Sequence, residues 1–258
     1  MTFETLLYTV EDRVARIMIN QADKMNRLSN TVLQELTCAL DHAQGDQEIK
    51  VLIITGAGDK AFCAGADLSS ISAGGILESR ENLGHYANLC LAFSRLSKPS
   101  IAMIKGYALA GGCGLAMLPT FSIASENAKF GLPEINVGMW PMMVMGILFR
   151  TVGRKKGLEL ICTGDMISAE QAERIGMITK VVADSELERH VAELAGRLKD
   201  KSGSVMQLGL EAFGISSDME FRKAIHYLRD MVCLIGNTPD CKEGTTAFME
   251  KRKPQWTT

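Results

Sequence analysis

Residues 99–118, PSIAMIKGYALAGGCGLAML, decide the fold of this chain. The apolar run at residues 99–104 has the length and composition of a strand that is buried on both faces. A glycine-rich turn at residues 106–114 follows, and an apolar helix is predicted from Leu115 to Leu118. Because buried strands that alternate with helices are typical of layered domains, we predict an α/β fold.

The same alternation continues on both sides of this stretch. Further strands are predicted at residues 5–10, 14–20, 51–55 and 177–182, and helices at residues 30–43, 80–96 and from 169 onward. Three turn residues join the first two strands, which predicts a hairpin. Ser29 is a predicted helix N-cap, and Ser168 with Gln171 forms a predicted capping box.

The end of the chain has a different character, because only helical patterns remain from Asp184 onward. Helices are predicted through Lys199 and then at residues 204–213, 218–234 and 240–251, the last ended by Pro254. We therefore divide the chain into a mixed α/β region at residues 1–195 and a helical region at residues 196–258.

Composition argues against several classes of protein. The 28 Lys and Arg residues stand against 30 Asp and Glu residues, so no basic excess favours nucleic acid. Residues 107–125 carry no charge, but glycines and Pro119 interrupt them, which argues against a membrane span. The seven scattered cysteines form no C-x-x-C pair, and no basic leader opens the chain. We expect reduced thiols, neither disulfides nor zinc, and a cytoplasmic location.

Two segments of small residues could offer backbone N–H groups to a ligand. The first, residues 61–68, ends at Asp67, which could cap a helix that starts at Leu68. A tight turn with an N-cap explains the same residues. The second, residues 106–114, aims the start of a helix at one point. Close packing of a helix on a strand, which only glycine tolerates, explains these residues equally well.

Glu134 is the only charged residue between Lys129 and Arg150. An isolated carboxylate in apolar surroundings is expected to have a raised pKa, which suits proton transfer near neutral pH. A first-turn glutamate after Pro133, favoured by the helix dipole, is the alternative interpretation. Together the amides could hold an enolate oxygen while the carboxylate moves a proton at the adjacent carbon.

A different motif points towards a dinucleotide. Residues 56–61, GAGDKA, match G-x-G-x-x-A directly after a strand, and Glu78 lies near the expected acidic position. However, residues 62–65 interrupt the helix that should receive the pyrophosphate. The motif is therefore interpreted as a plain turn, with an NAD-dependent dehydrogenase as a minor alternative.

Five segments in order carry a resemblance to a known family. They are DKMNRLS at residues 23–29, FCAGADL at 62–68, GYALAGGC at 106–113, KFGLPE at 129–134, and the predicted last helix with its tail at 240–254. Over essentially the whole chain, these segments resemble the crotonase, or enoyl-CoA hydratase/isomerase, superfamily.

The resemblance implies a spiral of β-β-α repeats, followed by a helical C-terminal region that assembles trimers or hexamers. It also implies an acyl-CoA thioester substrate and neither a metal nor a further cofactor, since coenzyme A belongs to the substrate. The amides of Ala66 and Gly111 would form an oxyanion hole, with Glu134 as the proton-transfer residue. The implied acyl-CoA-binding residues are Asp23, Lys24, Met25, Ala64, Gly65, Ala66, Asp67, Leu68, Gly111, Gly114 and Trp140.

The sequence departs from the family pattern at three places. Hydratases of the family use two glutamates, and the first of them corresponds to Gly114 here. One carboxylate can shuttle a proton between two carbons, so the departure favours double-bond isomerisation over hydration of an enoyl-CoA or dienoyl-CoA. Residues 139–145, MWPMMVM, either fill the core or reshape an acyl pocket that includes Trp140. Arg27 stands where alanine is common. A non-catalytic or RNA-binding protein is the remaining alternative.

Overall fold

Two sheets form the frame of the protein, whose computed structural model describes residues 2–66 and 75–257. The larger sheet has the strand order β1 (Leu6–Glu11), β2 (Val14–Ile19), β3 (Val51–Gly56), β5 (Ser100–Ile104), β7 (Phe121–Ser125), β10 (Lys180–Val182). The smaller sheet has the order β4 (Ala61–Cys63), β6 (Tyr107–Leu109), β8 (Lys129–Gly131), β9 (Met166–Ser168).

From β3 to β8, successive strands alternate between the two sheets. The chain passes from β3 to β4, from β5 to β6 and from β7 to β8, and each new strand lies parallel to the previous one in its own sheet. Within the described residues only β1 with β2 and β8 with β9 pair antiparallel. This connectivity confirms the predicted α/β spiral of β-β-α repeats.

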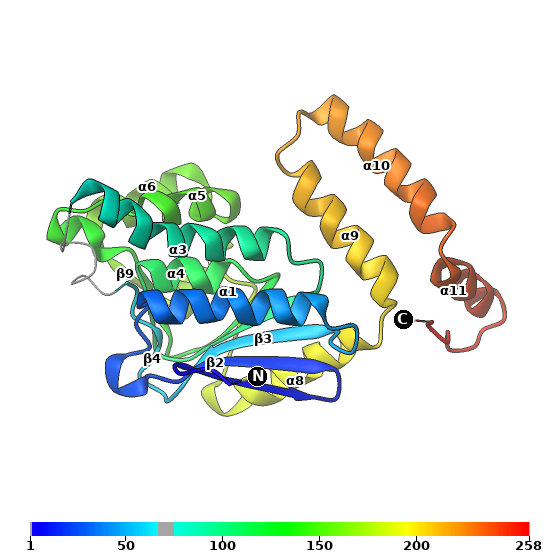
Figure 1. The fold of residues 1–258 in the computed structure, drawn as a ribbon, viewed down its shortest axis with the longest axis horizontal. Coiled ribbons are helices and arrows are strands. Elements are labelled where there is room, and N and C mark those ends of the chain that lie inside the picture. The colour runs from blue at the N-terminus through cyan, green and yellow to red at the C-terminus, as the bar shows by residue number, and fades with distance from the viewer. Residues whose placement is uncertain (1, 67–74, 258) are drawn as a thin grey trace.

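Helices cover both faces of the larger sheet, as Figure 1 shows for α1 and α8. The helices before the C-terminal arm are α1 (Asn30–Gly45), α3 (Ile76–Ser94), α4 (Gly111–Met117), α5 (Met142–Thr151), α6 (Arg154–Thr163), α7 (Ala169–Arg174) and α8 (Leu187–Lys199). In β3, Leu52 and Ile54 join the core beneath α1, while Val51 and Ile53 pack towards α8. Burial on both faces explains why these strands are continuous apolar runs.

Predictions that rest on residues close together in the sequence are confirmed, namely the hairpin, the helix N-cap and the capping box. β1 and β2 form the predicted hairpin, and both turn residues, Asp12 and Arg13, have positive φ. The Ser29 side chain accepts a hydrogen bond from the N–H of Val32 at the start of α1. The predicted capping box before α7 is also present.

Three predicted boundaries are wrong. α4 begins at Gly111 and not at Leu115, because the glycines of the supposed turn pack as its first helical turn against β4. α3 starts at Ile76, a turn before residue 80, and its first apolar residues are exposed and so break the amphipathic pattern. Met177 and Ile178 are buried but precede β10.

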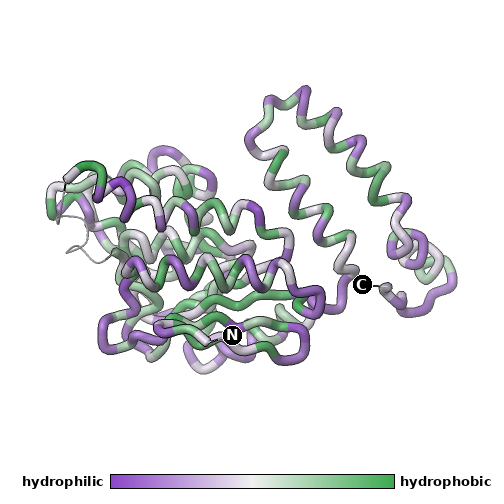
Figure 2. Tube along the Cα trace, in the orientation of Figure 1, coloured by the Kyte–Doolittle hydropathy of each residue, from purple (hydrophilic) through white to green (hydrophobic). Residues whose placement is uncertain are grey.

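The last three helices form an arm beside the sheets (Figure 1). They are α9 (Gly203–Ser216), α10 (Phe221–Gly236) and α11 (Pro239–Met249). Apolar and polar stretches alternate along α9 and α10 in Figure 2. Asp240 ties the arm together, because its carboxylate accepts hydrogen bonds from the Ser202 hydroxyl and from the N–H of Thr257. The division at residue 195 stays a prediction.

Among the described helices, none combines the length and the apolar character that a bilayer crossing requires. The uncharged residues 107–125 instead form β6, α4 and β7. Their lack of charge follows from burial between the sheets and the covering helices.

Gly112 provides a test of the packing between α4 and β4. A Cβ atom at this position would lie 2.1 Å from the backbone oxygen of Cys63, which cannot swing aside as a side chain could. We expect Gly112→Ala to lower the free energy of unfolding by about 1–3 kcal/mol or more in urea denaturation.

The matched control is Gly196→Ala in α8, where a Cβ would meet no atom within 4 Å. This substitution is expected to stabilise the fold by up to about 1 kcal/mol through helix propensity. Both variants are compared with wild type at one protein concentration. Equal effects of the two substitutions would contradict the packing argument.

Candidate active site

A cavity of about 830 Å³ lies between α1, α3 and the segment from residue 133 to residue 144. Five of the predicted site residues line it: Ala64, Ala66, Gly111, Glu134 and Trp140. The remaining wall is mostly apolar and includes Leu28, Leu33, Leu83, Tyr86, Pro141, Met142, Met143 and Val144.

Two backbone amides approach each other at this cavity. Ala66 follows β4, and Gly111 is the first residue of α4. A Cβ atom on Gly111 would lie only 3.8 Å from the nitrogen of Ala66. Neither amide N–H donates a hydrogen bond to another described residue. Two unused donors on a concave surface are suited to an oxygen atom that becomes negative during a reaction.

The backbone around these amides is held in place by unusual dihedral angles. Gly65 has φ +91°, and a Cβ there would lie 2.8 Å from both Ala110 Cβ and Leu109 O. Ala110 itself has φ 50°, and its N–H donates to Gly131 O of β8 at 2.9 Å. The conformation of Gly65 is one that glycine adopts without steric cost. The chain can therefore bring Ala66 next to Gly111 only with glycine at residue 65.

Glu134 lies in a short 3-10 helix, Pro133–Val137, directly after the proline that opens it. Its Oε2 atom is buried and has no hydrogen-bond partner among the described residues. Burial of the carboxylate raises the pKa of Glu134, although its own backbone N–H lowers it in part. Both predicted features, the first-turn position and the isolated carboxylate, are present. A carboxylate with an unsatisfied oxygen facing a cavity can accept a proton from a bound molecule.

The loop at residues 23–25, which the resemblance predicts to bind acyl-CoA, lies next to the cavity. Met25 O accepts a hydrogen bond from Ala64 N at 3.0 Å, so residue 25 lies beside a lining residue. Asp23 and Lys24 are exposed in the adjacent short helix, Ala22–Lys24. The buried Asn26 side chain fixes this loop through hydrogen bonds to Ala57 O and Ala61 O.

The cavity wall leaves out several predicted residues. Asp23, Lys24, Met25, Gly65 and Gly114 do not line it. Asp67 and Leu68 lie outside the described residues, so the predicted helix cap at Asp67 stays a prediction. The segment at residues 56–61 forms the end of β3 and the turn into β4, and a helix does not follow it within residues 61–66.

Tyr86 is a site residue that the sequence did not single out. Its side chain is buried, it lines the cavity, and its hydroxyl donates to Gly111 O at 2.9 Å. The only signal in the sequence is its helical spacing with Leu89 and Phe93 on the buried face of α3. That spacing indicates a core residue and does not reveal that the ring ends beside the glycine-rich helix.

Residues 139–145 both pack against the core and contribute to the cavity wall, while their role in holding an acyl chain stays a prediction. Trp140 and Met143 line the cavity and also pack against the core. The indole N–H of Trp140 donates to the sulfur of Met145 at 3.4 Å. Arg27 also lines the cavity.

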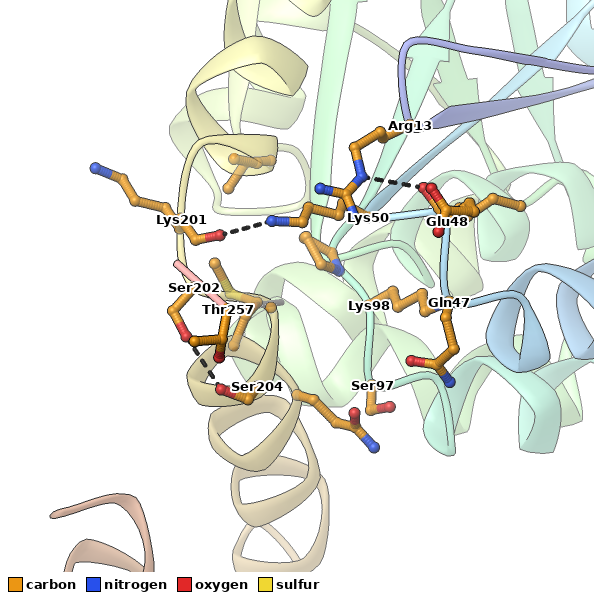
Figure 3. Close-up of a pocket in the computed structure, with 16 residues that line it drawn as sticks. Arg13, Gln47, Glu48, Lys50, Ser97, Lys98, Lys201, Ser202, Ser204 and Thr257 are labelled. Atoms are coloured by element: carbon orange, nitrogen blue, oxygen red, sulfur yellow. Dashed lines mark hydrogen bonds between the residues drawn. The ribbon is translucent and has the colours of Figure 1, made fainter. Parts of the chain in front are cut away.

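A second cavity, of about 290 Å³, is basic and contains none of the predicted site residues. It lies between the sheet region and the start of α9 (Figure 3). Three of its four cations donate to backbone oxygens: Arg13 to Glu48 O, Lys50 to Lys201 O, and Lys98 to Ala43 O and Asp46 O. These contacts indicate that the basic side chains of this cavity have a structural role.

The β-β-α spiral is the crotonase class of fold, and one cavity in it is lined by Ala66, Gly111 and Glu134, as the resemblance predicts. The family model described as enoyl-CoA hydratase/isomerase matches residues 9–258. The chain therefore belongs to the enoyl-CoA hydratase/isomerase family, and it is an enzyme of that family. The predicted superfamily is thereby confirmed.

Relatives and solved structures agree with this assignment. A crotonyl-CoA hydratase from Syntrophomonas wolfei is 37% identical over 254 residues, with 98% of each chain covered. A short-chain-enoyl-CoA hydratase from Clostridium acetobutylicum is 34% identical over 255 residues, which cover 98% of this chain and 97% of the relative. The crystal structure of an enoyl-CoA hydratase from Mycobacterium smegmatis has a TM-score of 0.95 and 29% identity, covering 98% of this chain and 99% of that one.

The raised pKa of Glu134 predicts how stability depends on pH. In the unfolded chain this carboxyl group ionises near its ordinary pKa of 4.5, whereas burial raises its pKa in the folded protein. The folded state therefore binds this proton more tightly, and its stability falls as pH rises through the raised pKa.

We expect Glu134→Gln to be more stable than wild type at neutral pH in urea denaturation, and the difference to vanish below pH 4.5. The control is Glu173→Gln on the exposed side of α7. A stability difference for Glu134→Gln that does not change with pH would show that burial of the charge is not its cause.

Proposed function

We propose that the enzyme moves the double bond of a 3-enoyl-CoA thioester to the 2-position. The observation that carries this proposal is that, among the described residues lining the cavity, Glu134 is the one carboxylate and the amides of Ala66 and Gly111 donate to none of the others. The thioester oxygen would accept hydrogen bonds from both amides. An oxygen held in this way can carry the negative charge of a dienolate.

The proton path in this proposal needs one side chain. The Glu134 carboxylate removes a proton from C2 of the 3-enoyl-CoA, and the electron pair of that C–H bond delocalises onto the thioester oxygen. The protonated carboxyl group then returns the proton to C4, which gives the 2-enoyl-CoA. No atom is gained or lost, and the carboxylate is regenerated.

Hydration is the second candidate, and the names of the relatives favour it, since both relatives named above are hydratases. Water would add its hydroxyl to C3 and a proton to C2 of an enoyl-CoA or dienoyl-CoA. Glu134 alone would have to orient the water and also deliver the proton. The position that carries the second glutamate in hydratases of the family is Gly114 here, and glycine has no side chain to supply a carboxylate.

The proposed acyl-CoA substrate also suggests which residues contact its coenzyme A portion and which contact its acyl chain. We propose that the exposed loop with Asp23, Lys24 and Met25, and the adjoining residues Ala64 and Gly65, meet the coenzyme A portion. The acyl chain would then lie against Trp140 and Met143. This chemistry needs no metal or redox cofactor, and a cytoplasmic location remains part of the proposal.

An isotope experiment separates the two reactions. Purified enzyme is incubated in D₂O with a 3-enoyl-CoA and, separately, with a trans-2-enoyl-CoA, and products are followed by mass spectrometry. We expect the 3-enoyl-CoA to become the 2-enoyl-CoA without gaining water. Glu134→Gln should lower this rate by about 10²–10⁴, because an amide cannot take the proton.

The control for the variant is Glu173→Gln, which should keep the wild-type rate because it lies on the exposed face of α7. If the wild type instead converts the trans-2-enoyl-CoA efficiently into the 3-hydroxyacyl-CoA, hydration replaces isomerisation as its function.

We also propose that the arm assembles the enzyme into a trimer or hexamer. Its helices expose large apolar side chains, among them Phe213, Phe221 and Phe248 at 71%, 75% and 84% exposure. Single exposed apolar residues are common, but several on one arm are a marker of an association surface.

Light scattering on purified protein should give the mass of three or six copies of the 28.1 kDa chain. The double variant Phe221→Asp/Phe248→Asp should lower that mass, because association would bury charges without partners. Lys242→Asp/Lys251→Asp, on the polar surface of the arm, is the control. A wild-type protein that remains a monomer at micromolar concentration would refute the assembly.

A further inference from the structure

The hydroxyl of Tyr86 fills the space that a side chain on residue 114 would need. A Cβ atom built on Gly114 would lie 2.2 Å from Tyr86 Oη. The next atoms it would meet are Val144 Cγ2 at 3.2 Å and Ile147 Cδ1 at 3.4 Å. Thus one atom, the phenolic oxygen, accounts for the severe overlap, and the others are the flexible ends of side chains.

The position of Tyr86 is fixed from both sides. Its hydroxyl donates to Gly111 O at 2.9 Å, which ties α3 to the first turn of α4. One turn earlier on α3, Asn82 Oδ1 accepts a hydrogen bond from Asn30 Nδ2 of α1 at 2.7 Å. These two bonds hold α3 with Tyr86 pointing into the cavity, so its hydroxyl cannot easily leave the space beside Gly114.

The chemistry of this hydroxyl differs from that of a carboxylic acid. Its only proton is already donated to Gly111 O. Burial raises the pKa of Tyr86 well above 10, and the nearby charge of Glu134 acts in the same direction. A neutral phenol with its proton engaged has no charge to accept a proton and no free proton to deliver.

We propose that Tyr86 is a specificity-determining residue: its neutral hydroxyl occupies the place that an acid/base side chain at residue 114 would need, so that Glu134 remains the one carboxylate among the described residues lining the cavity. The inference rests on the proposed function, because it explains why this cavity would favour proton transfer between carbons over the addition of water. Tyr86 would act by excluding an acid/base side chain from the space beside residue 114.

The steric part is tested without any activity measurement. We expect Gly114→Ala to lower the urea midpoint of unfolding strongly, because the new methyl group would overlap Tyr86 Oη. In the Tyr86→Phe background that oxygen is absent, and Gly114→Ala should change the midpoint little. The controls are Gly146→Ala, where a Cβ meets nothing within 4 Å, and Tyr107→Phe, which alters an exposed tyrosine. An equal effect of Gly114→Ala in both backgrounds would overturn the proposal.

The functional part is tested by the ratio of hydration to isomerisation, which a purely structural role would not move. Gly114→Glu is introduced into wild type, Tyr86→Phe and Tyr86→Ala, the last of which leaves more room should the phenyl ring still obstruct. The trans-2-enoyl-CoA and the 3-enoyl-CoA serve as probes. We expect Gly114→Glu to raise the ratio at least about tenfold in one of the two Tyr86 backgrounds, because a paired carboxylate can orient water, and not in wild type.

The outcomes separate this proposal from the proposed function. A tenfold rise with Tyr86 intact would overturn the inference, as would the lack of any rise in both Tyr86 backgrounds when circular dichroism shows them folded. A wild type that only hydrates would refute the isomerase function instead, and the stability comparison would still decide whether the hydroxyl excludes a side chain at residue 114.

Discussion

The close approach of two backbone segments, at Gly65–Ala66 and at Ala110–Gly111, is the constraint on which the site depends. The segments follow neighbouring parallel strands, β4 and β6, so the spiral delivers both to the same edge of the smaller sheet. Their final distance is set by the missing side chain of Gly65, whose Cβ would lie 2.8 Å from Ala110 Cβ. The left-handed φ of Ala110 is maintained by its hydrogen bond to β8. Strain of this kind persists where the surrounding structure determines it, and it often marks functional sites.

The apolar surroundings of the cavity affect both the two backbone amides and the Glu134 carboxylate. The amides of Ala66 and Gly111 lie on a mostly apolar cavity wall, and such surroundings make the attraction of an amide for a developing negative charge stronger than in bulk solvent. The same wall raises the pKa of Glu134 and leaves Oε2 without a partner. A buried carboxylate without a hydrogen-bond partner lowers the stability of the fold. Groups of this kind often have a functional role, and in the proposed function Glu134 accepts a proton.

Features that rest on neighbouring residues could be predicted from the sequence, whereas those that rest on distant contacts could not. The N-cap at Ser29, the capping box at Ser168 and the buried strand β3 each follow from a short local pattern. The start of α4 was missed because glycine normally argues for a turn, and only the contact with β4 shows that the glycines belong to the helix. Glu134 was singled out by its isolation in an uncharged stretch and the two amide segments by their small residues, whereas the family resemblance narrowed the amides to Ala66 and Gly111; the catalytic roles of all three stay predictions. Tyr86 was not singled out, because its importance arises where α3 crosses α4.

In the proposed function the backbone binds the substrate oxygen and side chains transfer the proton. Such a site can therefore change its reaction without changing its fold. In the proposed function backbone amides bind the thioester oxygen, and any sequence that permits the close approach at Gly65 supplies them. Proton chemistry depends instead on side chains at a few positions on different elements. Gly114 lies on α4, but the atom that fills its space belongs to Tyr86 on α3, which α1 holds through Asn30 and Asn82. If Tyr86 limits the chemistry as proposed, the reaction depends on helix packing outside the catalytic loops, and we expect a substitution at the interface of α1 and α3 to alter it without touching either amide.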